Sequence, residues 1–358
     1  MEGTSLFGLE TFDASQFQAT ETPVQNNAPC SYDDITNEML ASINNMNKYC
    51  LSKGTLGGLS WGLKSLDAAF DGLQPGLILV GGAPNTGKSA LCLQMGWQIA
   101  FANDLKTKET PYKAYVLYFS LDDNTTELLP RLIALDQKIP INIVKSPMKY
   151  QEMTKQLERR TLGVEKLQNS LDKFKIIDST KGTSIEYIES EVERHYVALK
   201  SKDEDYRLVV IIDNFHDITT TSVRNSENDN SRYDYICDKL SHLATIYDLP
   251  IICTAEFRKL NGTRRPIMDD VRSTTKIGYE AKAILLCYNE VGLKGEEASI
   301  YWELSGSEFK MPVLEVKVGK NKYSSYKGRL FYNFRPEMSR LEEATQDDIE
   351  KYRQLVNG

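Results

Sequence analysis

The sequence has no long apolar segment, and this excludes a protein that crosses the bilayer on a helix. No run of about 18 apolar residues is present, which is the length that such a helix requires. The first residues, MEGTSLFGLETFDASQF, lack the basic start and apolar core of a signal peptide. We therefore expect a cytoplasmic protein with no membrane partner.

The sequence also lacks a C-x-x-C pair, although it contains six cysteines. Pairs at that spacing are typical of zinc sites and of redox motifs. Most of the six lie inside apolar runs, which indicates reduced core residues and neither a disulfide framework nor a zinc site. The six cysteines are Cys30, Cys50, Cys92, Cys237, Cys253 and Cys287.

An excess of positive charge is absent as well. The chain has 43 Lys and Arg against 50 Asp and Glu, a formal net charge of −7, which argues against a protein that coats nucleic acid with its whole surface. The charge is unevenly distributed, because residues 258–282 contain seven Lys or Arg against three acids and residues 310–329 contain six against one. Taken alone, such runs are typical of solvated faces.

The 358 residues, of which 41% are hydrophobic, are enough for one large α/β domain with an appendage. Residues 1–30 have scattered single hydrophobics among Thr, Gln, Asn and Pro, which predicts a disordered tail. Residues 31–57 predict a linker helix followed by a Gly-rich connector, and residues 58–358 form the large domain. The apolar face of the linker helix consists of Ile35, Met39, Ile43 and Met46.

Within the large domain, short apolar runs alternate with helical patterns, which is the signature of a parallel sheet covered by helices. Helical patterns lie at residues 89–102 and 185–200, and residues 311–334 predict a β-hairpin near the C-terminus. We therefore predict an α/β fold with a mostly parallel, twisted sheet. The apolar runs lie at residues 77–80, 114–120, 174–177, 208–213, 250–255 and 283–288.

The pattern G-x-x-x-x-G-K-[ST] follows the first predicted strand and opens a helix. Glycines let backbone N–H groups approach phosphates, and the start of a helix favours negative charge. In such a loop Lys88 reaches the β and γ phosphates and the Ser89 hydroxyl ligates magnesium, so the sequence predicts ATP and Mg²⁺ as ligands. The loop consists of Gly82, Ala83, Pro84, Asn85, Thr86, Gly87, Lys88 and Ser89.

Two further acidic positions lie at predicted strand ends, where ligands bind in open α/β sheets. Asp213 follows five apolar residues, as a Walker B acid that holds magnesium does; the simpler interpretation is an Asp that caps the next turn. Asp122 and Asp123 follow the second predicted strand, although acidic residues are also common in plain turns. A motor needs one acid for the metal and one for the attacking water.

With these motifs in order, residues 58–344 resemble the C-terminal ATPase domain of DnaB-type replicative helicases. GLKSLDAAFDGLQPG resembles the family's entry segment, YFSLDD its F-S-L-E-M, and LSHLATIYDLPIICTAEFRK the approach to its S-Q-L-N-R sensor. RRPIMDDVRSTTKIGYEAKAILL resembles the D-L-R-E-S-G-S-I-E-Q-D-A-D region, and VKVGKNKYSSYKGRLFYNFRPEMSRLEEA the terminal hairpin with G-K-Q-R-N-G. About 55 residues precede this region, too few for the collar domain of bacterial members, so we expect the collar to be absent.

The resemblance implies a RecA-like P-loop ATPase core, a hexameric ring and ATP sites between subunits. It makes Asp122 the general base, one methylene shorter than the family's Glu, and it puts Glu256 in the place of the sensor Gln. Lys320 matches the hairpin Lys of the family, whereas Lys322 replaces its trans-acting Arg. A lysine still neutralises charge but lacks the bidentate fork of arginine.

The resemblance also implies that residues 272–276 contact single-stranded DNA. Hydroxyls, backbone N–H groups and cations suit phosphate contacts, which carry no base identity, so binding would be sequence-independent and salt-sensitive. The alternative is a plain surface loop. The candidate contacts are Arg272, Ser273, Thr275 and Lys276.

The function expected from the sequence is therefore a hexameric ATP-dependent helicase that moves along single-stranded DNA during replication, with a primase or a helicase loader as a further partner. One alternative is a DNA-dependent ATPase or recombinase similar to RecA, RadA or KaiC, and a filament on DNA would favour it. A second alternative is a weakly active or inactive ATP-binding ring scaffold, to which the residues at positions 122, 256 and 322 point.

Overall fold

The computed structural model describes residues 33, 36–37, 39–41, 43, 55–203, 205–222, 229–257, 263–271, 275–304 and 309–357. The chain divides into two compact units, residues 1–52 and 53–358. In the first unit the described residues are helical, within the stretch for which a linker helix is predicted, and the predicted tail lies outside the described residues. None of the described helices has the length and apolar character of a membrane span.

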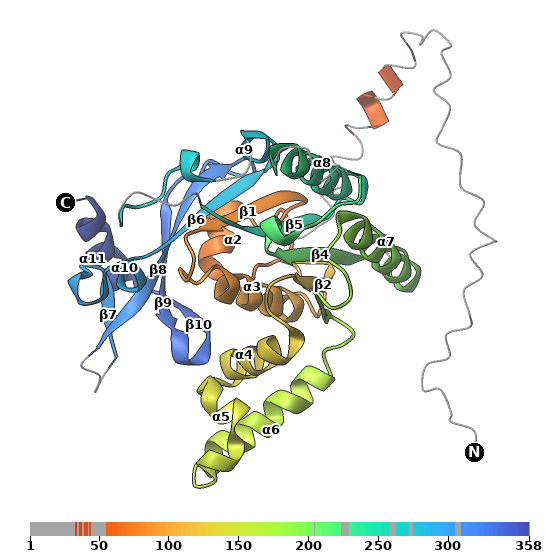
Figure 1. Ribbon diagram of the computed structural model, residues 1–358. Helices are drawn as coiled ribbons and strands as arrows, with labels where there is room; N and C mark the ends of the chain where they lie inside the picture. The colour runs from red at the N-terminus through yellow and green to blue at the C-terminus, as the bar shows by residue number, and fades with distance from the viewer. Residues whose placement is uncertain are drawn as a thin grey trace, which may run out of the picture. The chain divides into compact units, whose positions relative to one another are not determined.

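One large sheet organises the second unit (Figure 1). Its parallel part has the strand order β6-β1-β5-β4-β2-β3, and an antiparallel part continues it in the order β8-β9-β10. Each of the six predicted apolar runs forms one of the parallel strands, which confirms the predicted α/β class. These strands are β1 (Gly76–Gly82), β2 (Lys113–Ser120), β3 (Phe174–Asp178), β4 (Tyr206–Asp213), β5 (Pro250–Glu256) and β6 (Ala283–Asn289).

Helices cover both faces of the parallel strands, because alternate residues of each strand point to opposite faces. In β1, Ile78 and Val80 pack with α2 (Lys64–Phe70) and α3 (Lys88–Ala102), whereas Leu77 and Leu79 face the opposite layer. That layer contains α7 (Ile185–Lys202) and α8 (Asp229–Ile246), and Figure 1 shows α7 and α8 across the sheet from α3. Each fully buried aliphatic side chain contributes about 1.5–3 kcal/mol.

A helical excursion separates β2 from β3, and the sequence did not predict it. Figure 1 shows its helices extending away from the sheet below α3. Their small core includes Ile133, and Gly163 lets two of them approach, because a Cβ there would lie 2.8 Å from Ile133 Cγ2. The excursion is tied to β3 by Asp178, which accepts a hydrogen bond of 2.6 Å from the Thr125 hydroxyl. Its helices are α4 (Thr125–Gln137), α5 (Ile141–Lys145) and α6 (Thr154–Gln168).

The C-terminal part contains the predicted hairpin, formed by β8 (Lys310–Asn321) and β9 (Arg329–Arg335). The strand after the hairpin, β10, is held by Gln94 of α3. The Gln94 side chain donates to the Leu341 carbonyl and accepts from the Leu341 N–H, both at 2.7 Å. The remaining elements are α9 (Thr275–Glu280), α10 (Glu290–Lys294), β7 (Tyr301–Glu303), β10 (Arg340–Glu343) and α11 (Gln346–Asn357), with short 3-10 turns η2 (Pro147–Tyr150), η3 (Phe215–Asp217), η4 (Met268–Asp270), η5 (Gly295–Glu297) and η6 (Pro336–Met338).

Candidate functional site

Most of the predicted phosphate and acidic positions meet at one edge of the sheet, the carboxyl edge of the parallel strands. Gly82, where the predicted phosphate loop begins, is in register with Glu256 at the end of β5. Ser120 at the end of β2 is in register with Asp213 at the end of β4. Because parallel strands end at the same edge, loops that are distant in the sequence lie together there.

The loop between β1 and α3 is shaped by left-handed backbone. Asn85 has φ of 59° and Gly87 φ of 104°, and a Cβ on Gly82 would lie 2.7 Å from the Thr86 hydroxyl. Lys88 is only 7% exposed, and its ammonium donates a 2.9 Å hydrogen bond to the Ala83 carbonyl. The N-cap of α3 is Gly87, which provides no side-chain cap. The helix therefore presents N–H groups and a lysine to the same loop, a combination that suits anionic oxygens.

Asp213 is held from two sides. One carboxylate oxygen accepts a 2.5 Å hydrogen bond from the Thr254 hydroxyl, and the other accepts a 3.1 Å bond from the Tyr118 hydroxyl. Burial raises the pKa of Tyr118, and the charge of Asp213 raises it further, so the tyrosine stays a neutral donor. Neither Thr254 nor Tyr118 is predicted from the sequence. In the sequence each of them is only a hydroxyl within an otherwise apolar strand. The pairing of the strands is what brings that hydroxyl to Asp213.

The two acids after β2 differ in their surroundings. Asp122 is exposed, whereas Asp123 forms a 2.7 Å ion pair with Arg131 of α4. Of the two, Asp122 is thus the carboxylate that is available to a water molecule at this edge. Glu256, the third predicted acid, is also exposed, and its backbone N–H donates to His216 Nδ1 at 3.4 Å.

Asp217, in the turn η3 that follows β4, is a further acid that sequence reasoning missed. It accepts a 2.7 Å hydrogen bond from the Asn214 side chain. The pKa of its carboxyl is raised, first by desolvation and then by the charges of Asp122, Glu256 and Asp213. These four carboxyls therefore share one electrostatic environment.

Lys320 and Lys322 lie at the opposite, amino edge of the sheet. The N–H of Lys322 donates to the Lys282 carbonyl at 2.9 Å, and the N–H of Lys282 donates to the Leu77 carbonyl at 2.7 Å. Leu77 lies five residues before Gly82 in β1, about 17 Å at 3.3 Å per residue. That separation exceeds the length of a lysine side chain, so the hairpin lysines do not reach the phosphate loop of their own chain.

The hairpin turn beside these lysines is braced against the start of the domain. Asn321 Nδ2 and the Ser324 hydroxyl both donate to the Ala69 carbonyl, at 3.1 and 2.6 Å. The Tyr323 hydroxyl donates to the Pro75 carbonyl at 3.2 Å. The position of Lys322 is consequently fixed by its neighbours in the chain.

The structure describes only part of the segment that is predicted to contact DNA. Arg272, Ser273 and the side chain of Thr275 lie outside the described residues. Lys276, in the first turn of α9, forms a 2.5 Å ion pair with Asp238 of α8. This pair holds the described end of the segment against α8, and the role of the segment stays a prediction.

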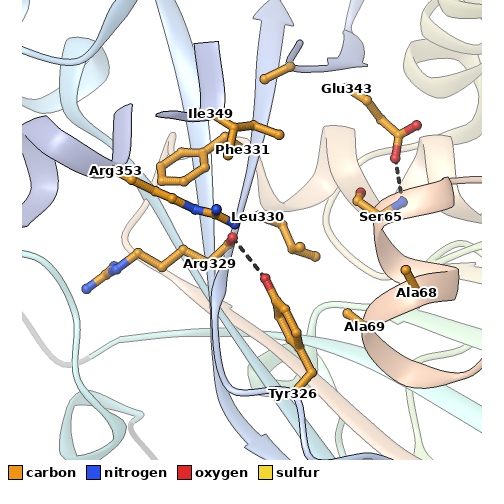
Figure 2. Close-up of a pocket in the computed structure, with 11 residues that line it drawn as sticks. Ser65, Ala68, Ala69, Tyr326, Arg329, Leu330, Phe331, Glu343, Ile349 and Arg353 are labelled. Atoms are coloured by element: carbon orange, nitrogen blue, oxygen red, sulfur yellow. Dashed lines mark hydrogen bonds between the residues drawn. The ribbon is translucent and has the colours of Figure 1, made fainter. Parts of the chain in front are cut away.

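A pocket of about 350 Å³ lies away from the phosphate loop, between α2, β9 and α11. Figure 2 shows Glu343 turned toward Ser65, whose N–H it accepts at 2.6 Å, and Tyr326 donating to the Arg329 carbonyl at 3.1 Å. Arg353 extends from α11 toward the same hollow. The residues that line it include none of the predicted site residues, so the pocket does not coincide with the candidate site.

Protein ligands alone do not form a metal centre in the described part of the chain, where no group of three His, Cys, Asp or Glu side chains is suitably arranged. Magnesium in phosphate sites commonly takes one or two protein ligands, with waters and phosphate oxygens for the rest. Ser89 and Asp213 at the carboxyl edge suit that mode. The described cysteines are free and buried, as expected for core residues: Cys92, Cys237, Cys253 and Cys287.

Residues 58–343 match the family model of the DnaB-like helicase C terminal domain. A probable replicative DNA helicase of Trieres chinensis is 28% identical over 287 residues, which cover 79% of this chain and 57% of that protein. The replicative DNA helicase DnaB of Leifsonia xyli subsp. xyli (strain CTCB07) is 24% identical over 266 residues, 72% of this chain and 52% of that protein. The chain thus spans little more than half the length of these relatives.

Two solved structures have the same fold. One of them, an ATPase domain, aligns with a TM-score of 0.69 at 19% identity, over 89% of this chain and all of that one. A DnaB-like replicative helicase, described with its interactions with primase, aligns with a TM-score of 0.68 at 19% identity, over 89% of this chain and 68% of that one. Together with the strand order, these likenesses confirm the predicted RecA-like ATPase fold.

Proposed function

Since the chain belongs to the DnaB-like helicase C-terminal domain family, we propose that it is an ATP-hydrolysing motor that acts as a hexameric ring on single-stranded DNA during replication. The observation that carries the proposal is the carboxyl edge, where the buried Lys88 and the hydrogen-bonded Asp213 lie beside a helix start without a side-chain cap. The curated relatives carry helicase names, which supports the assignment.

The loop residues bind and orient the nucleotide in this proposal. The loop from Gly82 to Ser89 surrounds the phosphates with backbone N–H groups, and Lys88 exchanges its bond to the Ala83 carbonyl for phosphate oxygens. Lysine binds phosphate as a point charge, which tolerates movement of the γ-phosphate.

Ser89 and Asp213 would hold Mg²⁺, because a hydroxyl and a carboxylate are the hard oxygen ligands that it prefers. When bound, the ion neutralises charge that develops on the phosphates. Thr254 and Tyr118 each donate to one oxygen of Asp213 and thereby fix its orientation. Asp122 would accept a proton from the attacking water, and Glu256 would take the sensor position.

The second half of each ATP site comes from a neighbouring copy. Lys320 and Lys322 lie at the opposite edge of the sheet from the loop that they would serve, so one chain supplies a phosphate loop and a separate cationic edge. A ring closes such a head-to-tail contact around a rotation axis. The linker helix within residues 31–57 is proposed to pack on an adjacent copy, residues 272–276 to contact the DNA backbone, and a primase or loader to bind the ring.

Steady-state ATP hydrolysis with and without single-stranded DNA tests the proposal. We expect turnover that DNA stimulates and that Lys88→Ala abolishes, while Lys108→Ala, a control at an exposed lysine, retains it. Nucleotide binding without any turnover in the wild-type protein would contradict the motor and favour the ring scaffold. A filament on DNA with strand exchange would instead favour the recombinase.

A further inference from the structure

Lys282 lies beside the two hairpin lysines, and the predicted site did not include it. Its carbonyl accepts from the N–H of Lys322 at 2.9 Å, so the two residues are joined through their backbones. Its side chain runs over Gly76, where an added Cβ would lie 2.5 Å from Lys282 Cγ. The aliphatic stem is therefore held against β1, while the side chain as a whole remains exposed.

The three lysines at this edge are bonded differently. The ammonium of Lys320 donates to the Gly278 and Tyr279 carbonyls, at 2.7 and 2.8 Å, and so caps the end of α9. Lys282 and Lys322, by contrast, make no side-chain hydrogen bond or ion pair with any part of the chain that the structure describes. Two ammonium groups are thus available to a ligand, and the third is engaged in the fold.

The positive charge at this edge is concentrated. The pKa of Lys320 is lowered, first by desolvation and then by repulsion from Lys322 and Lys282, with Glu280 acting in the opposite direction. Glu280 itself accepts a 2.9 Å hydrogen bond from the Ser241 hydroxyl. A polyanion at the edge would relieve the mutual repulsion of these cations.

The resemblance puts Lys322 in the place of an arginine of the family's hairpin. An ammonium lacks the five-donor fork of a guanidinium, and a second ammonium nearby supplies the missing charge and donors.

We propose that Lys282 acts with Lys322 on the phosphates of a nucleotide held by the adjacent copy. This inference rests on the proposed function, since it requires ATP sites shared between copies. A single-stranded DNA backbone is the other polyanion available, and the exposed Tyr279 nearby would suit a base. The nucleotide is favoured because Lys282 is joined through its backbone to Lys322, which the proposed function assigns to the ATP site of the adjacent copy.

The test compares Lys282→Gln, which keeps the stem over Gly76 and removes the charge, with Lys282→Arg, which keeps the charge. Lys327→Ala is the matched control, because it removes an exposed lysine from the same hairpin turn. Turnover without DNA, ADP affinity and affinity for single-stranded DNA are measured for each. Melting temperature and ring assembly are recorded in parallel, so that a structural defect is recognised.

We expect Lys282→Gln to lower the DNA-free kcat about tenfold, the effect of one charge-assisted phosphate contact, with affinities for ADP and DNA unchanged. Lys282→Arg should restore most of the rate. An unchanged kcat, or a loss of DNA affinity at normal DNA-free turnover, would overturn the inference. Loss of turnover in Lys88→Ala with normal turnover in Lys282→Gln would leave the proposed function standing and reject only this role.

Discussion

The two edges of the sheet differ in how completely one chain builds them. At the carboxyl edge Lys88 is buried and bonded to Ala83, and Asp213 receives hydroxyl donors on both carboxylate oxygens. At the amino edge Lys282 and Lys322 are exposed and make no side-chain bond with the described residues. The first edge is organised in advance for a ligand, and the second has cations that lack a counter-ion within the described part of the chain.

This difference follows from the free-energy cost of burying charge in a parallel sheet. A buried charge is stable only when hydrogen bonds or opposite charges compensate it, so a nucleotide site inside one chain must carry its own donors. A site shared between chains does not need them in the free subunit, because the partner supplies the counter-charge on assembly. The contrast between the edges therefore supports a motor that completes its active site only as an oligomer.

Among the variants that test this difference between the two edges, Lys322→Ala is expected to have the largest effect on turnover. Removing the cation that is proposed to act across the interface should lower DNA-stimulated turnover at least about a hundredfold, because charge developing on the phosphates would lose its compensation. Nucleotide binding should stay nearly unchanged, since the loop from Gly82 to Ser89 is intact. Steady-state kinetics beside a fluorescent-nucleotide titration measures both quantities, and unchanged turnover would remove Lys322 from the site.

A smaller effect is expected at the carboxyl edge from Thr254→Val. The substitution keeps the shape of the side chain and removes the 2.5 Å hydrogen bond to Asp213. We expect about a tenfold lower turnover and a higher Mg²⁺ concentration for half-maximal activity, because the carboxylate loses a fixed donor. Thr254→Ser keeps the hydroxyl and is the control. Equal Mg²⁺ dependence in both variants would show that Thr254 does not orient the acid.

The smallest effect is an effect on stability, at the junction between β3 and the helical excursion, which lies at the carboxyl edge of the sheet. Hydrogen bonds from Thr125 and Thr180 lower the pKa of Asp178 to about 2 from an ordinary 3.8. The pKa of Asp178 is lower in the folded protein than in the unfolded chain. The ionised carboxylate therefore stabilises the fold above about pH 4, and this stabilisation is lost as the pH falls toward 2. Asp178→Asn should lower the free energy of unfolding by about 1 kcal/mol at pH 7.

Denaturant unfolding at pH 7 and at low pH measures this contribution, with Asp172→Asn as an exposed control. The difference between Asp178→Asn and the wild type should shrink as the pH falls. A difference that is the same at both pH values would mean that the charge of Asp178 is not what stabilises the junction.

Much of the fold could be predicted because its signals are local. Each central strand is a short apolar run, and the phosphate loop has a fixed spelling between a strand and a helix. The excursion after β2 could not be predicted in the same way, since α4 contains Pro130 and α6 buries only Gly163. Such helices form because they pack on each other and on the sheet, which periodicity along one segment does not reveal.

The candidate site was predictable to a similar extent. Lys88 and Asp213 follow from strand ends and loop spacing, whereas Thr254, Tyr118 and Asp217 depend on which strands become neighbours. Lys282 became a candidate only when the backbone bond to Lys322 joined two segments that lie 40 residues apart. Contacts of this kind are set by register and strand order, which a single sequence does not specify.

Mixing two inactive variants tests the sharing of the site most directly. Rings assembled from equal amounts of Lys88→Ala and Lys322→Ala subunits contain interfaces at which an intact phosphate loop meets an intact hairpin lysine. Random assembly produces this combination at about one interface in four, so we expect turnover near a quarter of the wild-type value. Turnover no higher than that of the two variants measured separately would contradict a site shared between copies.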